Sequence, residues 1–315
     1  MKRQRGAALL LAMLTVALVA TLASAALWRQ WRAIEVESSE RARLQAGWML
    51  SGALDWARLI LREDARSGAV DHLGEPWAVV LQESRLSSFL ALEGQEAADT
   101  DAAFLSGAIS DAQSRMNITN LVAGGKLSEP DQLAFARLFA RLGVDGAVLE
   151  QLGDQLLLSQ GAALEGGTSA PLRPRRLEQL AWLGLSAESL RVLQPYVVLL
   201  PARTPLNLNT AGVEAIAASI AGLESADARK FVEARDRRPL RSLADAQRLL
   251  PADVAALAPG QFSVASRFFE VRGRLRIDGI VVEESSLLDR NGLGVFIVWR
   301  ERVAPGIAVP PSPGR

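Results

Sequence analysis

The 315-residue sequence contains no cysteine and a single histidine, His72. The first absence excludes disulfide scaffolds, thiol nucleophiles and zinc–thiolate sites, and the second removes most sites that need paired imidazoles. Only three residues are lysine, and the 35 basic side chains are balanced by 35 acidic ones. A chain without net charge has no sequence-independent attraction for nucleic acid. Hydrophobic residues nevertheless make up 49% of the chain, which is enough for two modest folded units.

A long uncharged run is present at the N-terminus, from Ala7 to Leu27, directly after a short basic leader that ends at Gly6. As an α-helix this run would extend roughly 31 Å, about the thickness of the hydrocarbon core of a bilayer. The basic leader should stay on the cytoplasmic side. The sequence therefore predicts one membrane span, with the bulk of the chain on the opposite side.

Three interpretations of this segment compete. Ala23-Ser24-Ala25 fits the cleavage site of an ordinary secretory signal, which would remove the helix. The segment could equally be an uncleaved anchor. The third interpretation is a prepilin-type leader, which a dedicated peptidase cuts after the glycine that precedes the apolar run, so that the helix stays on the mature protein.

The residues that follow the span favour the third interpretation. Apolar positions recur at helical spacing and predict an amphipathic helix that continues the span without a break and ends near Gly68: Met49, Gly52, Trp56, Leu59 and Ile60. A cleaved signal has no reason to be followed by such a continuation. A single-pass anchor with a juxtamembrane helix remains the plain alternative.

The middle of the chain reads as mostly helical over residues 117–159 and 177–258. A stretch rich in Gly, Pro, Ser and Thr, from Gly161 to Arg175, separates the two blocks and is typical of a joint. Each block opens with an asparagine-rich phrase, Met116–Asn120 and Leu206–Ala211, whose Asn and Thr side chains can cap a helix. We therefore expect two weakly related helical subdomains. A small, acidic connection from Glu93 to Asp101 precedes them.

The second block resembles the helix-hairpin-helix fold that grips DNA phosphates. Such a grip needs a hairpin of backbone N–H groups opened by paired glycines. The hairpin expected at Ala221–Ser225 has one glycine and places Glu224 where phosphate would lie. A neighbouring basic run, Arg235 to Arg241, is interleaved with acidic residues, which is typical of a solvated face. We expect no nucleic-acid partner, and a membrane-anchored DNA-binding module remains the alternative function.

After Gly260 the pattern changes to period two. Phe269, Val271, Leu275 and Ile277 alternate with charged residues, and Asp278-Gly279 then offers a tight turn. A second strand is expected from Ile280 to Leu288 and a third from Leu293 to Arg300, after the turn at Asn291-Gly292. The result is an antiparallel sheet with one face free to cover a helix.

The apolar faces of the N-terminal helix and the C-terminal sheet can be buried only against each other. The predicted class is α+β, a pilin-like unit with a large, mainly α-helical inserted domain. The expected division is a leader (1–6), a membrane helix (7–27), the spine helix and following segment (28–100), the inserted domain (101–260, joint near 160–175), the sheet (261–303) and a loose tail (304–315).

In this order, these features resemble the general secretion pathway protein K family, the minor pseudopilins of bacterial type II secretion. The resemblance rests on the leader Arg3–Gly6, the helix from Gln45 to Ala57, the phrase Glu75–Ala78, both asparagine-rich starts and Arg241–Asp245. It implies cleavage between Gly6 and Ala7 by prepilin peptidase and methylation of the new Ala7 amine. It also implies minor pseudopilins of the I and J types as partners, and an inner-membrane location with a cytoplasmic N-terminus and a periplasmic bulk.

Leu11 occupies the fifth mature position, where most pilin-like subunits have glutamate. A carboxylate inside the bilayer costs about 2.5–3.5 kcal/mol unless the amine of the subunit ahead pairs with it. A first subunit has no neighbour ahead, so leucine at this position suits the tip of an assembly. The plain alternative is that Leu11 is one more apolar residue of the span.

We expect a structural protein and not an enzyme, because the sequence lacks a nucleophile and base in a recognisable pattern. No cofactor is required by this interpretation. The resemblance also suggests that the chain binds calcium, but it assigns no ligands for the ion. Four oxygen donors near a hairpin are the nearest candidates, with a solvated turn as the alternative: Glu283, Glu284, Asp289 and Asn291.

Overall fold

The structure is a computed structural model that describes residues 3–86, 103–160, 170–277 and 279–303. The expected tail, the acidic connection and most of the joint between the helical blocks lie outside the described residues.

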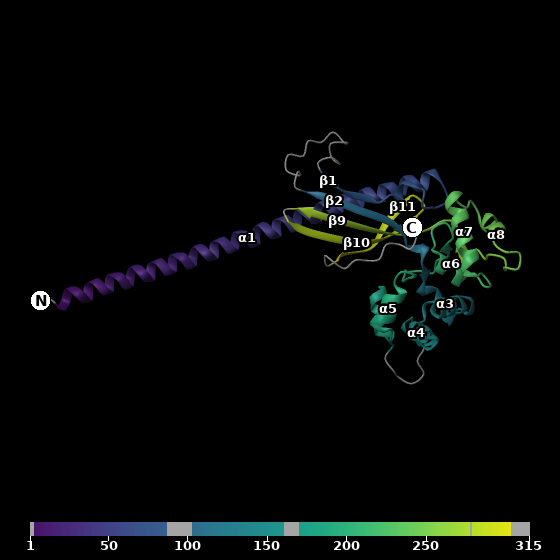
Figure 1. The fold of residues 1–315 in the computed structure, drawn as a ribbon, viewed down its shortest axis with the longest axis horizontal. Helices are drawn as coiled ribbons and strands as arrows, with labels where there is room; N and C mark the ends of the chain where they lie inside the picture. The colour runs from purple at the N-terminus through teal and green to yellow at the C-terminus, as the bar shows by residue number, and fades with distance from the viewer. Residues whose placement is uncertain (1–2, 87–102, 161–169, 278, 304–315) are drawn as a thin grey trace.

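One helix, α1 (Arg3–Ser67), runs from the leader through the uncharged segment and into the globular part without a break (Figure 1). Its 65 residues correspond to a rod of about 98 Å. It ends one residue before Gly68, so the predicted continuous helix is confirmed. Within the apolar run, the hydroxyls of Thr15 and Thr21 donate hydrogen bonds of 2.8 Å to the carbonyls of Ala12 and Leu18, which satisfies both polar groups inside the helix.

The buried face of α1 differs from the predicted one. Six residues at helical spacing are at most 6% exposed, and all but the first pack with residues of the sheet: Ala42, Ala46, Leu50, Leu54, Ala57 and Leu61. The stripe predicted from the sequence lies about a third of a turn away and is only partly buried. Alanine allows the helix to approach the sheet closely, whereas the larger Met49 and Trp56 lie on the flank of the contact.

A five-stranded antiparallel sheet covers this face of α1. Its strands are β1 (Leu81–Arg85), β2 (Phe104–Asp111), β9 (Phe268–Ile277), β10 (Ile280–Asn291) and β11 (Gly294–Val303), in the order β1-β2-β9-β10-β11. The predicted C-terminal meander is confirmed, and its turns place Gly279 and Gly292 at φ of +78° and +57°, where glycine is favoured. The two strands that precede the insertion were missed.

The alternation predicted for β9 is also confirmed. Phe269 and Val271 pack with Leu61 of α1, and Leu275 packs with Leu50. Trp77 packs edge-on to Phe269, with ring centroids 5.3 Å apart. The charged residues between them lie on the opposite face of the sheet, where Glu270 pairs with Arg115 at 2.7 Å. One face of the sheet thus forms the core with α1, and the other carries paired charges and, around Phe268 and Leu287, an apolar cluster shared with the insertion.

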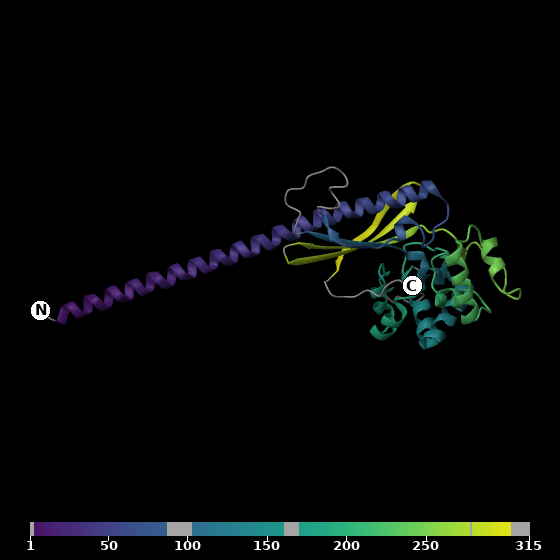
Figure 2. The same cartoon turned by 45° about the horizontal axis from the view of Figure 1, so that its top comes forward.

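The inserted domain is mainly helical and lies toward the end of the sheet far from the N-terminus, partly alongside the sheet on the side away from α1 (Figures 1 and 2). Its α-helices are α3 (Glu129–Leu142), α4 (Gly146–Ser159), α5 (Ala187–Leu193), α6 (Val213–Ser219), α7 (Ser225–Arg237) and α8 (Leu243–Leu249). Its 3-10 helices are Ala112–Ser114, Ile118–Leu121 and Leu177–Leu183, and a further one, Pro76–Ala78, precedes β1. Two-residue strands complete it: β3 (Met116–Asn117), β4 (Val122–Ala123), β5 (Lys126–Leu127), β6 (Val197–Val198), β7 (Leu206–Asn207) and β8 (Phe262–Ser263).

The boundaries expected at 101 and 260 are corrected by the structure. Strand β2 extends to Asp111 within the sheet, so the insertion starts after this residue. At the other end, β8 pairs with β7 of the insertion, and the sheet resumes at Phe268. The two strands that flank the insertion, β2 and β9, are direct neighbours.

The asparagine-rich phrases do not begin α-helices, although Asn117 caps a helix as expected, the 3-10 helix Ile118–Leu121. Each phrase forms half of a two-residue parallel pair, β3 with β6 and β7 with β8. The Asn117 side chain accepts a hydrogen bond from Thr119 N at 3.1 Å, and Asn207 accepts one from Asn209 N at 2.9 Å. Asparagine here bends the chain locally, because its side chain competes for backbone N–H groups. The α-helices follow later, at Glu129 and Val213.

Candidate assembly surfaces

The N-terminal half of α1 is a rod with apolar side chains on all sides. It is the one helix among the described residues that is long and apolar enough to cross a membrane, and its most apolar window is entirely exposed. Gly6 and Ala7 lie in its first turns, and Leu11 is exposed one turn further on. The structure therefore places all three predicted site residues on one uncovered helix. Cleavage after Gly6 and methylation of Ala7 stay predictions.

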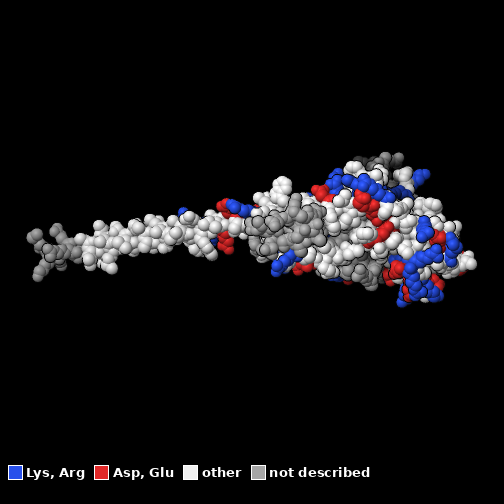
Figure 3. Space-filling view, turned by 90° about the horizontal axis from the view of Figure 1, so that it is seen from above, with Lys and Arg blue, Asp and Glu red and all other residues white. Residues whose placement is uncertain are grey.

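Charge is distributed unevenly along the molecule. Figure 3 shows the rod almost free of charged side chains, while basic and acidic side chains are interspersed over the globular end. Many of these are ion pairs, such as Arg276 with Glu83 at 2.9 Å and Arg274 with Glu283 at 3.2 Å. Basic side chains predominate at the end of the globular part farthest from the rod, with acidic ones among them (Figure 3).

A buried carboxylate, Asp111, joins the pilin-like unit to the inserted domain. Its Oδ1 accepts a hydrogen bond from Gln113 N at 2.7 Å, and its Oδ2 accepts bonds from Ser266 Oγ at 2.6 Å, Thr210 Oγ1 at 2.5 Å and Asn207 Nδ2 at 3.0 Å. Burial raises the pKa of Asp111 to about 6, against the effect of these donors. Asp111 ends β2 and Ser266 precedes β9, so one side chain holds both connections of the insertion.

A second polar cluster lies beside this junction and was missed in the sequence. Arg290 Nη1 lies 2.7 Å from Asp64 at the end of α1, and Arg290 Nη2 lies 2.5 Å from Asp71. Arg290 also donates to Ser266 O at 2.8 Å. Burial, followed by the nearby charges of Glu75 and Asp71, raises the pKa of Asp64 to about 6. The cluster ties the end of α1 to β10 and to the exit of the insertion.

Asp64, Asp71 and Glu75 form the acidic group with a geometry that could hold a metal ion, because their oxygens lie within 4.8 Å of one another. The guanidinium of Arg290 already neutralises two of them. Glu75 accepts a hydrogen bond from Trp77 Nε1 at 2.8 Å, and His72 Nδ1 accepts one from Gly74 N at 3.1 Å. His72 is thus a loop side chain, as the sequence indicated.

The four calcium candidates do not form a common site. Glu283 and Glu284 are consecutive on β10 and point to opposite faces. Glu284 is paired with Arg300 and Arg302, and Asp289 is held by Arg267 in a bidentate pair at 2.5 and 2.6 Å. Asn291 is at the β10–β11 turn. Calcium binding stays a prediction without assigned ligands.

The helix-hairpin-helix resemblance takes the form of α6, a turn and α7. Gly222, in that turn, has a φ of +79°, and Glu224 directly precedes α7. Arg235, expected on a solvated face, is instead 2% exposed and donates to Leu208 O, while Arg237 is solvated as predicted. Burial lowers the pKa of Arg235. The hairpin is therefore a packing element, and nothing in the described geometry favours the DNA-binding alternative.

A spine helix that is long and apolar enough to span a membrane, and that packs on an antiparallel sheet, defines a pilin-like fold, here with a large helical insertion. A solved structure has a similar fold, described as the GspK-GspI-GspJ complex of the type 2 secretion system of enterotoxigenic Escherichia coli. Its matching chain is 21% identical and gives a TM-score of 0.66, with 84% of this chain and 98% of that one covered. This likeness shows the fold.

Sequence comparisons find similarity to one family. Two profiles described as type II secretion system (T2SS), protein K, match residues 114–202 and 206–265, which together make up most of the insertion. The type II secretion system protein K of Pseudomonas aeruginosa is 28% identical over 99% of this chain and 96% of its own length. That of Pectobacterium carotovorum is 28% identical over 95% and 96%. Over the insertion, and in sequence along nearly its whole length, the chain is similar to the protein K family of type II secretion systems, a family of minor pseudopilins.

Proposed function

We propose that this chain initiates or caps the tip of the type II secretion pseudopilus, an assembly that exports folded proteins across the outer membrane. The observation that carries this proposal is the position of the insertion, at the end of the pilin-like unit far from the membrane-spanning half of α1 (Figures 1 and 2). A subunit stacked directly beyond this end would meet the inserted domain. The chain can therefore receive neighbours below it but not above it.

Leu11 supports the same position in the assembly. An acidic residue there would need the amine of a subunit ahead to offset its cost in the bilayer. The first subunit of a filament has no such neighbour, and a leucine removes the cost. Two independent features, one at each end of the molecule, thus favour the tip.

We further propose that prepilin peptidase cleaves the chain between Gly6 and Ala7 and that the new amine of Ala7 is methylated. The mature chain would then be a single-pass protein of the inner membrane, with its N-terminus in the cytoplasm and its bulk in the periplasm. The uninterrupted helix from Arg3 to Ser67 supports this proposal, since it gives the apolar segment a structural role after cleavage.

The proposed partners are the minor pseudopilins of the I and J types of the same secretion system. The solved structure with the similar fold supports this choice, because it is a complex of GspK with GspI and GspJ. The proposed role is purely one of assembly, without catalysis. A chain with no cysteine and one histidine, engaged in a loop, offers no pattern of nucleophile and base.

Copy number per filament tests the tip position. The full-length chain would be expressed at its native level with the other components of the system, and isolated pseudopili would be analysed by quantitative mass spectrometry. We expect the number of copies per filament to stay constant when overproduction of the main filament subunit lengthens the pseudopili. A copy number that grows in proportion to length would refute the proposal.

Intact-mass analysis with and without prepilin peptidase tests the processing. We expect a mature chain that begins at methylated Ala7. A start at Ala26 would identify an ordinary secretory signal, and an intact Met1 would leave a simple anchor.

A further inference from the structure

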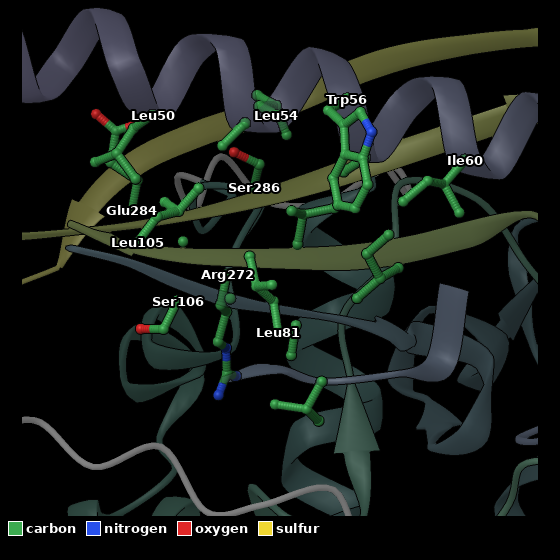
Figure 4. A pocket seen from close by; sticks show the side chains of 18 of the residues that line it. Leu50, Leu54, Trp56, Ile60, Leu81, Leu105, Ser106, Arg272, Glu284 and Ser286 are labelled. Carbon is green, nitrogen blue, oxygen red and sulfur yellow. The ribbon is translucent and has the colours of Figure 1, made fainter. Parts of the chain in front are cut away.

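A cleft of about 1090 Å³ lies between the sheet and the inserted domain, on the face of the sheet opposite α1. The sheet lines one side of it, including Arg272 of β9 and Trp299 of β11, and residues between Arg175 and Leu199 of the insertion line the other. Figure 4 shows the α1 side of the sheet, where another, apolar groove lies. In this view the Arg272 side chain points away from α1, and thus toward the cleft.

Several charged groups of the cleft are paired with one another. Arg176 reaches across from the insertion to pair with Glu301 of β11. Its guanidinium also lies over the ring of Trp299, with the Cζ atom 4.5 Å from the ring centroid. On the sheet, Arg274 pairs with Glu283 at 3.2 Å. A charged ligand would have to compete with these pairs, so the cleft favours an uncharged occupant.

One donor that lines the cleft lacks an acceptor. The carboxylate of Glu270 is shared by two arginines, Arg115 at 2.7 Å and Arg272 at 3.6 Å. The Nε of Arg272 is buried and has no hydrogen-bond partner among the described residues. A buried N–H group without an acceptor costs stability, and such groups are therefore nearly always bonded. An acceptor from outside the described residues would complete this arrangement.

The chain leaves the sheet at the edge of this cleft. Strand β11 ends at Val303, which is itself one of the lining residues. Twelve residues follow, from Ala304 to Arg315, of which four are proline and none before Arg315 is charged. A proline-rich segment favours the polyproline II conformation, which has no internal hydrogen bonds and leaves its carbonyl groups free to accept them. The sequence thus supplies an uncharged segment with free acceptors next to an unsatisfied donor.

We propose that residues 304–315 dock in this cleft as an extended segment and strap the inserted domain to the sheet. A carbonyl group of the segment accepts a hydrogen bond from Arg272 Nε. Ile307 contacts apolar side chains that line the insertion side of the cleft, such as Leu177 and Leu190. The inference is independent of the proposed function, because it concerns contacts within one chain.

The dimensions of the sheet fit this docking. Arg272 pairs with Ser285, and Ser285 pairs with Glu301, two residues before the end of β11. Two strand spacings across and two residues along correspond to roughly 12 Å. An extended proline-rich segment advances about 3.1 Å per residue, so about four residues after β11 bring the chain, near Ile307, to Arg272. The remaining eight residues extend about 25 Å further, which is enough to cross to the insertion.

Photo-cross-linking of the purified full chain in detergent tests the docking. A photoreactive phenylalanine analogue would replace Ile307, or Leu133, 54% exposed on α3, as the control. We expect Ile307 to cross-link within one chain to β9 or to peptides between Arg175 and Leu199. The yield of these cross-links should be at least about fivefold above that from Leu133, because a docked segment stays close to its site.

Truncation after Val303 tests the role of Arg272 by thermal unfolding in detergent. We expect the truncation to lower the melting temperature by about 2–4 °C, the effect of losing one buried hydrogen bond. In an Arg272→Met background the donor is gone, so the same truncation should lower the melting temperature by less than half as much. Arg274→Met is the matched control. Arg274 lies on the same face of β9 but is already paired with Glu283, so the truncation should keep its full effect there.

Both tests have contrary outcomes. If Ile307 cross-links to another copy of the chain, to α1, or no better than Leu133, the segment does not occupy its own cleft and the inference is wrong. It is also wrong if the truncation has the same effect in all three backgrounds, or no effect in any of them. Should the truncated chain fail to fold, the cross-links of the full chain decide.

Discussion

The substitution Asp111→Asn tests the junction that holds the inserted domain on the pilin-like unit. The carboxylate accepts hydrogen bonds from four donors on the two connections and on the insertion itself. An asparagine of the same shape has one acceptor oxygen, and its NH2 group must face at least one of these donors. Leaving a buried donor unsatisfied costs about 1–3 kcal/mol. We expect the free energy of unfolding at pH 7 to fall by about this amount.

The pH dependence provides a sharper test. The pKa of Asp111 is raised from 3.8 to about 6 by burial, so the folded chain binds this proton more readily than the unfolded chain. Its contribution to stability is therefore fully present below pH 3.8 and is lost as the pH rises through 6. Between pH 7 and pH 5 the wild-type chain gains about 1 kcal/mol from this group, and the Asn variant does not. The destabilisation by Asp111→Asn should therefore be larger at pH 5.

The measurement is urea unfolding of the full chain in detergent at both pH values, for wild type and variant. Asp64, whose pKa is also raised, titrates in both proteins and cancels in the difference. Asp55→Asn is the matched control, since its pair with Arg58 is 68% exposed on the Asp55 side and should be worth less than about 1 kcal/mol at either pH. A destabilisation by Asp111→Asn that shrinks on acidification would refute this reasoning.

Three further predictions concern other parts of the fold. Leu11→Glu should insert into the membrane yet impair initiation of the pseudopilus, because its carboxylate costs about 2.5–3.5 kcal/mol without a partner ahead; secreted protein in the culture medium measures this. Arg290→Ala should destabilise the chain by about 3–5 kcal/mol at pH 7, since it leaves the Asp64 carboxylate without its pair. The loss should be smaller at pH 5, where Asp64 is protonated, as thermal unfolding would show. Gly107→Val should cost about 1–3 kcal/mol, because its Cβ would lie 2.7 Å from the Arg272 carbonyl oxygen and β2 must shift.

Each of these has a control and a contrary result. Leu11→Ile should secrete normally, and normal secretion by Leu11→Glu would count against the tip argument. An Arg290→Ala loss that grows at pH 5 would mean that the carboxylates are not the source of the cost. Gly52→Ala adds the same Cβ in open space on a helix and should not destabilise, so an equal effect of both glycine changes would contradict the packing explanation.

Local patterns predicted the ends of the fold well. Unbroken apolar and helical spacing predicted α1 to within one residue of its end, and period-two alternation with two glycine turns predicted β9 to β11. The face of α1 could not be predicted, because Ala42, Ala46 and Ala57 carry little hydrophobic weight and yet permit the closest approach to the sheet. Strands β1 and β2 were missed because β2, which pairs with β1, finds its other partner, β9, only on the far side of the insertion.

The junction shows why the functional geometry was harder to foresee. Asp64, Asp71 and Arg290 are ordinary charged residues at their positions in the sequence, and only the fold brings the end of α1 to β10. The one feature of the sequence that could have pointed to this cluster was Asp71, an acidic residue in a turn shortly after a long helix. The buried Arg235 was missed for a related reason, because a basic run is usually solvated. Nothing in the local sequence distinguishes Arg235, whose guanidinium donates a hydrogen bond to the Leu208 carbonyl inside the core, from its exposed neighbours.

The adjacency of β2 and β9 also sets the order in which the molecule can be completed during synthesis. The chain is synthesised from its N-terminus, so α1, β1 and β2 are made first, and the central strand β9 appears only after the whole insertion. Until Phe268 and the residues after it arrive, the face of α1 that carries Leu50, Leu54 and Leu61 lacks most of its cover. The apolar face of α1 therefore stays exposed for most of the synthesis of the chain. It is covered only when β9, β10 and β11 are complete. A chain truncated after Ser266 should accordingly be degraded or aggregate, even though it retains the inserted domain.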